Sequence, residues 1–167
     1  MLIVDRNNNQ DSNECAFFTL PVVDGYIWSA KDQIAGLRLK AIVDGKGILL
    51  QGKDPEFIKT GPSAMRINWP LTSVEGTLEV NLSEKEIKMK LVTPKPINWF
   101  FDLNTADGIK LPFTGVNNKS LDCRFEGMNY SVKASEGFFT RPDNPGILRI
   151  SPQVNTITLN LAETSNE

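Results

Sequence analysis

The sequence predicts an all-β fold, an antiparallel two-sheet β-sandwich that is jelly-roll-like or a meander and has about a dozen short strands. Apolar and polar residues alternate in four stretches that can each fold back on themselves as a β-hairpin. Turn-forming residues separate the candidate strands at intervals of roughly 8–12 residues, and no stretch favours a long helix. The strands of the hairpins carry polar residues on one face, as expected when one side of a strand is buried in a two-sheet sandwich. These solvent-side residues include Glu79, Lys88, Lys90, Asp122, Arg124 and Lys133.

The N-terminal part of the chain predicts two short strands after a polar loop. Residues 7–13 are all polar, so we expect a long loop there. Cys15–Leu20 reads as a strand limited by the proline that follows it. Gly25–Ala30 reads as a second short strand with two aromatic residues, and a short helix around Lys31–Ala35 is the alternative for the segment after it.

The first predicted hairpin lies between Leu37 and Leu50. Apolar residues alternate with charged ones up to Val43, and Asp44-Gly45 comes next. Asp-Gly between two apolar runs is one of the strongest short-range signals of a hairpin.

The second predicted hairpin has a four-residue loop at residues 83–86. A helix starting at Ser83 is the alternative, but it would scatter the apolar residues of the second arm around its circumference. The hairpin instead places them on one face. It sets Leu82 against Ile87, Val80 against Met89, Leu78 against Leu91 and Glu79 against Lys90.

The third hairpin covers Ser120–Ala134, and a fourth closes the chain. We expect a two-residue type II′ turn at Gly127-Met128, because glycine suits its first position. This register sets Phe125 against Tyr130, Cys123 against Val132, Leu121 against Ala134 and Asp122 against Lys133. The fourth hairpin sets Leu148 and Ile150 against Ile157 and Leu159.

Two further strands are predicted without a hairpin partner. Met65, Ile67 and Trp69 alternate with polar residues until a proline ends the run. Asn98–Leu103 is apolar on both faces, so it is either covered on both sides or carries an exposed aromatic ring.

Length and composition fit one domain over residues 1–167, expected to be a module of a larger protein. The chain has 40% hydrophobic and 23% charged residues and a net charge of −2. Without a basic excess we expect no nucleic-acid partner. No stretch is long enough for a membrane span, and the N-terminus lacks the pattern of a signal peptide. A carbohydrate-active module would work outside the cytoplasm, and otherwise the sequence leaves the location open.

The absence of histidine excludes whole classes of chemistry. It removes the commonest metal ligand and rules out Ser-His-Asp and Cys-His catalysis. The two cysteines, Cys15 and Cys123, are not spaced as metal ligands, and a disulfide between them requires neighbouring strands. No phosphate-binding or dinucleotide-binding glycine motif occurs. We therefore expect no cofactor and no metal.

The carboxylates offer two weaker candidates for a functional site, a catalytic acid pair and a calcium-binding loop. Glycoside hydrolysis needs two acids flanking a groove, and Asp102 with Asp107, or Asp122 with Glu126, lie close in sequence. A solvated sheet face is the better interpretation of Asp122 and Glu126. Residues 102–108 loosely resemble a calcium loop, but the ligand spacing is wrong, which favours an ordinary turn.

Aromatic residues supply the expected binding site. Tyr26, Trp28 and Trp99 are candidates to stack on a sugar, and a core position is the alternative for Trp28 and Trp99. Trp69 has the register of a core residue. An all-β sandwich of short strands is typical of accessory domains of polysaccharide-degrading enzymes. This is an analogy at the level of the fold class. We expect a non-catalytic accessory module, carbohydrate-binding through these rings, with a glycan or a neighbouring catalytic domain as partner. The alternatives are a structural or adhesive protein-interaction module and a β-jelly-roll glycosidase that uses carboxylates.

Overall fold

The protein is an all-β sandwich of two antiparallel sheets, as the sequence predicts. The computed structural model describes residues 22–23, 26–27, 36–104, 113–125, 128–142 and 147–163. Their 15 strands form a sheet of eight, a sheet of five and a separate two-stranded ribbon, and this part of the chain contains no helix. The ribbon pairs β1 (Val22–Val23) with β2 (Tyr26–Ile27).

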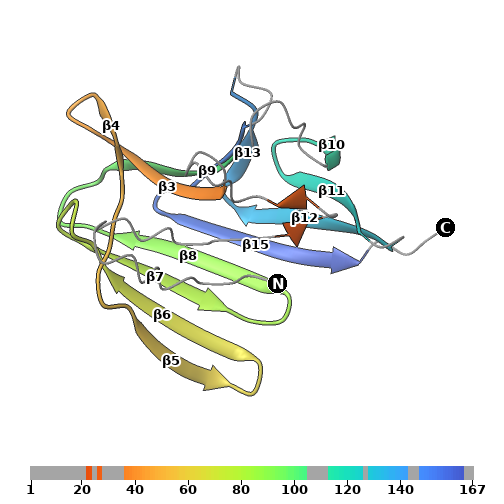
Figure 1. The fold of residues 1–167 in the computed structure, drawn as a ribbon, viewed down its shortest axis with the longest axis horizontal. Helices are drawn as coiled ribbons and strands as arrows, with labels where there is room; N and C mark the ends of the chain where they lie inside the picture. The colour runs from red at the N-terminus through yellow and green to blue at the C-terminus, as the bar shows by residue number, and fades with distance from the viewer. Residues whose placement is uncertain are drawn as a thin grey trace.

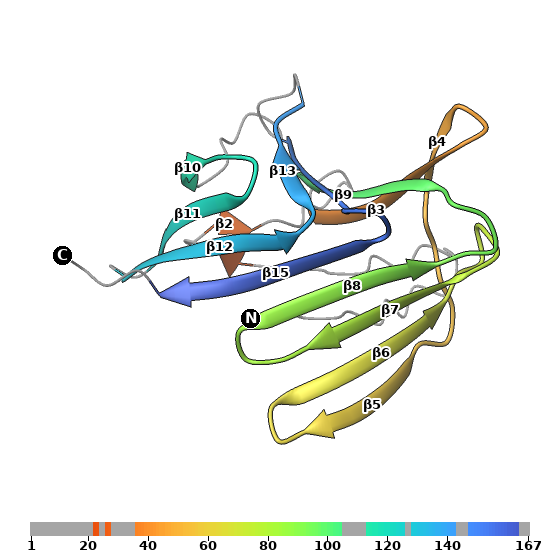
Figure 2. The ribbon, with the colours of Figure 1, turned by 180° about the vertical axis from the view of Figure 1, so that it is seen from behind.

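The larger sheet has the strand order β10-β11-β12-β15-β8-β7-β6-β5 (Figures 1 and 2). Two meanders, β5 to β8 and β10 to β12, are joined side by side by β15. The bounds are β5 (Glu56–Gly61), β6 (Ala64–Pro70), β7 (Thr77–Leu82), β8 (Glu86–Val92), β10 (Phe113–Val116), β11 (Ser120–Phe125), β12 (Met128–Glu136) and β15 (Thr156–Glu163).

The smaller sheet has the strand order β13-β14-β9-β3-β4, with β9 in the middle. Its edge strands β13 and β4 are far apart in the sequence, and β9 pairs with β14 on one side and with β3 on the other. The bounds are β3 (Gly36–Val43), β4 (Lys46–Leu49), β9 (Asn98–Asn104), β13 (Phe138–Thr140) and β14 (Ile147–Ser151).

The first two predicted hairpins are confirmed. In β3–β4 the chain turns at Asp44-Gly45, whose φ angles of 50° and 75° are the positive pair that a type I′ turn needs. In β7–β8 every predicted pair is present, including Val80 with Met89 and Glu79 with Lys90.

The predicted register of the third hairpin is wrong by two residues. Met128 belongs to β12 and is opposite Phe125, which the prediction set against Tyr130. Because side chains alternate with a period of two, this shift leaves the apolar set on the same face. The other predicted pairs change accordingly: Cys123 is opposite Tyr130, Leu121 opposite Val132, Asp122 opposite Ser131 and Ser120 opposite Lys133.

The fourth predicted hairpin does not form. Leu148 and Ile150 belong to β14, which pairs with β9 and β13, whereas Ile157 belongs to β15, which pairs with β12 and β8. The chain crosses from one sheet to the other between these strands. Leu148 and Ile157 are both fully buried, so they meet the core from opposite sheets and not from adjacent strands.

The core fills the space between the two sheets. Trp69 and Trp99 are both core side chains, 3% and 1% exposed. Phe100 on the other face of β9 is also buried, so this strand is covered on both sides. The larger sheet contributes Ile67, Leu78, Val80, Met89, Leu91 and Ile157, and the smaller one Leu39, Ala41, Phe101, Phe139, Leu148 and Ile150.

The face assignment of β12 can be tested with Val132→Asp. Val132 is half-buried against the core, so an unpaired charge there should lower the free energy of unfolding by about 1–2 kcal/mol. Lys133→Asp places the same side chain on the neighbouring exposed position and should cost much less. Urea unfolding measures both variants, and equal losses would show that Val132 does not face the core.

Candidate functional site

A buried carboxylate lies on the outer face of the smaller sheet. Along β9, Trp99 and Phe101 point into the core, and Phe100 and Asp102 therefore point to the opposite face. Asp102 is only 1% exposed, and it is the one charged side chain among the buried residues that the structure describes. A carboxylate in this position requires charged partners, because burying it alone would be very costly.

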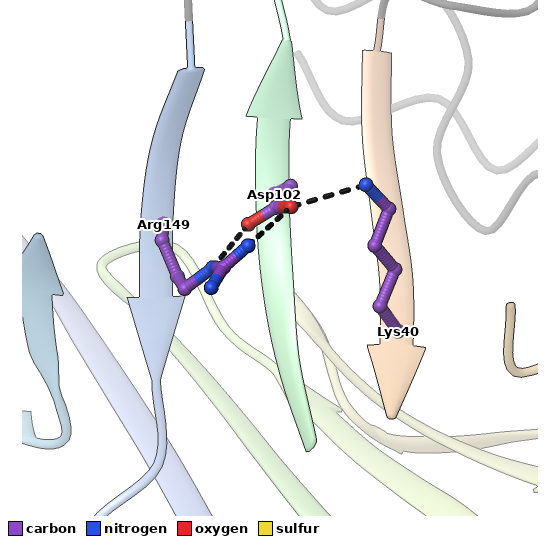
Figure 3. Close-up of polar contacts among 3 residues, drawn as sticks. All are labelled: Lys40, Asp102 and Arg149. Atoms are coloured by element: carbon purple, nitrogen blue, oxygen red, sulfur yellow. Dashed lines mark hydrogen bonds and ion pairs between the residues drawn. The ribbon is translucent and has the colours of Figure 1, made fainter. Parts of the chain in front are cut away.

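Two cations from the flanking strands bind this carboxylate (Figure 3). Arg149 on β14 donates from Nε to Oδ1 at 2.8 Å and from Nη2 to Oδ2 at 3.0 Å. Lys40 on β3 donates from Nζ to Oδ2 at 3.1 Å. Arg149 is directly opposite Asp102 in the sheet, which suits the two parallel bonds of a guanidinium with a carboxylate. The three side chains therefore link three adjacent strands.

The guanidinium of Arg149 is held from a second direction. Its Cζ lies 3.8 Å from the centre of the Phe100 ring, a cation–π contact. The hydrogen bond to Asp102 raises the pKa of Arg149 above its already high ordinary value, so its charge is fixed at any physiological pH. The two cations remain accessible, since the side chains of Arg149 and Lys40 are 33% and 31% exposed.

This geometry makes Asp102 a positioning group. A carboxylate that already accepts three charge-assisted hydrogen bonds, away from water, is poorly placed to attack a substrate. What it does well is fix the orientation of two cations at the surface. We refer to Lys40, Phe100, Asp102 and Arg149 as the Asp102 cluster.

The role of the cluster has to be argued from its chemistry. Comparison of the chain with protein-family models, curated proteins and solved structures finds no match. Among the described residues, no three or more acidic, cysteine or histidine side chains are grouped as metal ligands. The same residues include no helix long and apolar enough to cross a membrane.

Of the three aromatic residues predicted to stack on a sugar, the structure describes one ring. Trp99 is a core residue whose ring meets Phe101 edge to face at 6.0 Å between centroids. Its 1% exposure leaves no ring face for a ligand, which is the core alternative for this residue. Trp28 and the side chain of Tyr26 lie outside the described residues, so these two remain predictions.

The structure describes only some of the residues predicted as candidate catalytic carboxylates or as the possible disulfide. Asp102 is occupied by its two cations, and Asp122 is exposed and opposite Ser131. Their proposed partners Asp107 and Glu126, like Cys15, lie outside the described residues.

Lys40 and Arg149 were not predicted as site residues. Their spacing in sequence is long, and only the order of the strands brings them to Asp102. The available signal was the composition of β9: a single acidic residue in a strand that is apolar on both faces requires a buried ion pair. The sequence offers no signal for which basic residues supply it.

Proposed function

We propose that the chain is a non-catalytic β-sandwich module that binds a glycan as an accessory part of a larger polysaccharide-processing protein. The observation that best supports binding is the outer face of the smaller sheet, where exposed apolar side chains lie beside the fixed cations. The ion pairs of Asp102 support a non-catalytic role, because this buried carboxylate binds both Lys40 and Arg149.

Three large apolar side chains on this face are substantially open to solvent. Ile42, Leu49 and Phe138 are 40%, 39% and 39% exposed. They share the face with Lys40 and Arg149, since Leu49 is directly opposite Lys40 and strand residues alternate between faces. Apolar side chains gathered on one face of a surface often mark a contact site.

The outer face of the larger sheet is different. It is built mainly from amide, hydroxyl and charged side chains that bond to each other across strands, such as Asn68 with Glu56 and Arg66 with Asn81. Lys88 pairs with Glu136 at 3.2 Å, and Thr158 donates to the same carboxylate, which lowers the pKa of Glu136. Because these polar side chains already bond to each other, we take the smaller sheet as the better candidate for a binding face.

The glycan-binding proposal can be tested with affinity electrophoresis on a panel of polysaccharides. We expect wild type to bind at least one member with a dissociation constant of about micromolar to millimolar, as for shallow sites. Trp28→Ala should weaken this binding. Phe57→Ala, which removes a partly exposed aromatic ring from β5 of the other sheet, should leave it unchanged.

The possible outcomes separate the proposed functions. Failure of wild type to bind any polysaccharide would contradict the glycan proposal and favour the structural or adhesive module. Release of reducing sugars during the same incubation would contradict the non-catalytic role and favour a carboxylate glycosidase.

The protein-interaction alternative has one observation in its favour. Strand β5 pairs with β6, and no other described strand pairs with its opposite edge, so an extended segment of a partner could add to the sheet at this edge. Its Lys59 and the bulge between Lys59 and Gly61 are features that natural edge strands use against such pairing.

A further inference from the structure

We propose that the ligand of the smaller sheet is an acidic polysaccharide whose uronate carboxylates bind to Lys40 and Arg149. This inference rests on the proposed glycan-binding function and names the class of glycan and the residues that recognise it. The Asp102 cluster and the apolar side chains beside it carry the argument.

The cluster presents positive charge to solvent. Two cations surround one carboxylate, which leaves a net charge of +1 on these three side chains (2 − 1 = +1). The negative group is 1% exposed, whereas each cation is about a third exposed. A ligand that approaches this face therefore meets the ammonium and guanidinium groups and not the carboxylate between them.

Within the described part of the chain, both cations have more N–H donors than their bonds to Asp102 use. Arg149 uses Nε and one bond from Nη2 for Asp102, and a guanidinium has further N–H groups on Nη1 and Nη2. Lys40 makes one bond to Asp102, and an ammonium group has more than one N–H. These remaining donors suit a second oxyanion, such as the carboxylate of a uronic acid.

The guanidinium is already ordered before a ligand arrives. Asp102 holds it along one edge and the Phe100 ring covers it at 3.8 Å. A long side chain that is fixed in advance loses little conformational freedom on binding, which favours affinity. Asp102 is therefore a positioning residue for the anion site, since it acts on the ligand through Arg149.

The neighbouring apolar side chains select a sugar over other anions. Leu49 is directly opposite Lys40, and Ile42 lies two residues further along β3 on the same face. A pyranose ring presents C–H groups that can pack on such side chains while its carboxylate reaches the cations. A nucleic acid would need a broader basic surface, and the chain has a net charge of −2.

The experiment compares polygalacturonate with dextran, a neutral polymer of similar length, by isothermal titration at low and high salt. Wild type should bind polygalacturonate more tightly than dextran, and added salt should weaken this binding. Lys40→Gln leaves both Arg149–Asp102 bonds in place and should reduce the affinity for polygalacturonate about five- to tenfold.

Lys90→Gln is the matched control. It removes the same charge from an exposed lysine on the outer face of the other sheet and should change the affinity less than about twofold. Leu49→Ser is a second test variant that removes apolar contact without touching the ion pairs, and it should also weaken binding. Thermal melting of each variant confirms that it is folded.

Three results would overturn the inference in different ways. Equal weakening by Lys40→Gln and Lys90→Gln would show general charge attraction and not a site. Equal or tighter binding of dextran would refute an acidic ligand while leaving the glycan proposal intact. Failure to bind either polymer, or any other polysaccharide of the panel, would refute both.

Discussion

Arg149→Met is expected to lower the free energy of unfolding by about 3 kcal/mol, at the lower end of the range for breaking a buried ion pair. The substitution removes two of the three hydrogen bonds that described side chains donate to Asp102, so Lys40 is the one described cation left at a carboxylate that is 1% exposed. Methionine keeps much of the volume of the arginine stem, so the decrease in unfolding free energy is due mainly to the lost charge. Urea unfolding of the variant and of wild type gives the difference.

The double variant Asp102→Leu/Arg149→Met is the control for this prediction. With both charges gone, no carboxylate is left buried without its main partner, so the double variant should be more stable than Arg149→Met alone. Lys40→Met should cost less, because the bidentate pair remains. A double variant less stable than the single one would mean that the pair is itself a major source of stability.

Gly52→Ala is expected to destabilise the protein by about 3 kcal/mol, the upper end of the range for overpacking a core. A Cβ atom at this position would lie 2.3 Å from Cε2 and Nε1 of Trp69, a ring that is itself buried. The backbone on both sides is tied down, since Lys53 donates to the carbonyl of Pro70 at 3.0 Å and Thr72 to that of Gln51 at 2.8 Å. The backbone at Gly52 therefore cannot move away from the ring without breaking these hydrogen bonds, and the ring is packed in the core.

Gly47→Ala provides the comparison for the same substitution in open space. No atom lies within 4 Å of a Cβ built on Gly47, so stability should change by less than about 1 kcal/mol and can rise slightly. Thermal or urea unfolding of the two variants suffices. Similar midpoints for both would mean that the Trp69 ring does not pack on Gly52.

The fold was predictable where a local turn fixes the register. Asp44-Gly45 and the four-residue loop before Ile87 each determine which residues pair, and the structure agrees. Alternation alone carries less information. A shift of two residues keeps every side chain on its face. The alternation of apolar and polar residues therefore could not separate the predicted Phe125–Tyr130 pair from the observed Phe125–Met128 pair.

Alternation also cannot identify the sheet to which a strand belongs. Leu148 and Ile157 have the same pattern whether their strands pair or face each other across the core, which is why the last hairpin was predicted wrongly. The Asp102 cluster was missed for a related reason. Lys40, Asp102 and Arg149 meet only because β9 lies between β3 and β14, and this order depends on long-range packing.

The position of β15 has a consequence for how the protein is made. The strands β5 to β8 and β10 to β12 each form by pairing neighbours along the chain, but the two groups meet only through β15, which follows all the other described strands in chain order. During synthesis, β8 and β12 therefore each present an open edge until this strand has left the ribosome. The larger sheet is complete only once β15 has been made, and up to that point the nascent chain has two unpaired strand edges whose native partner is β15.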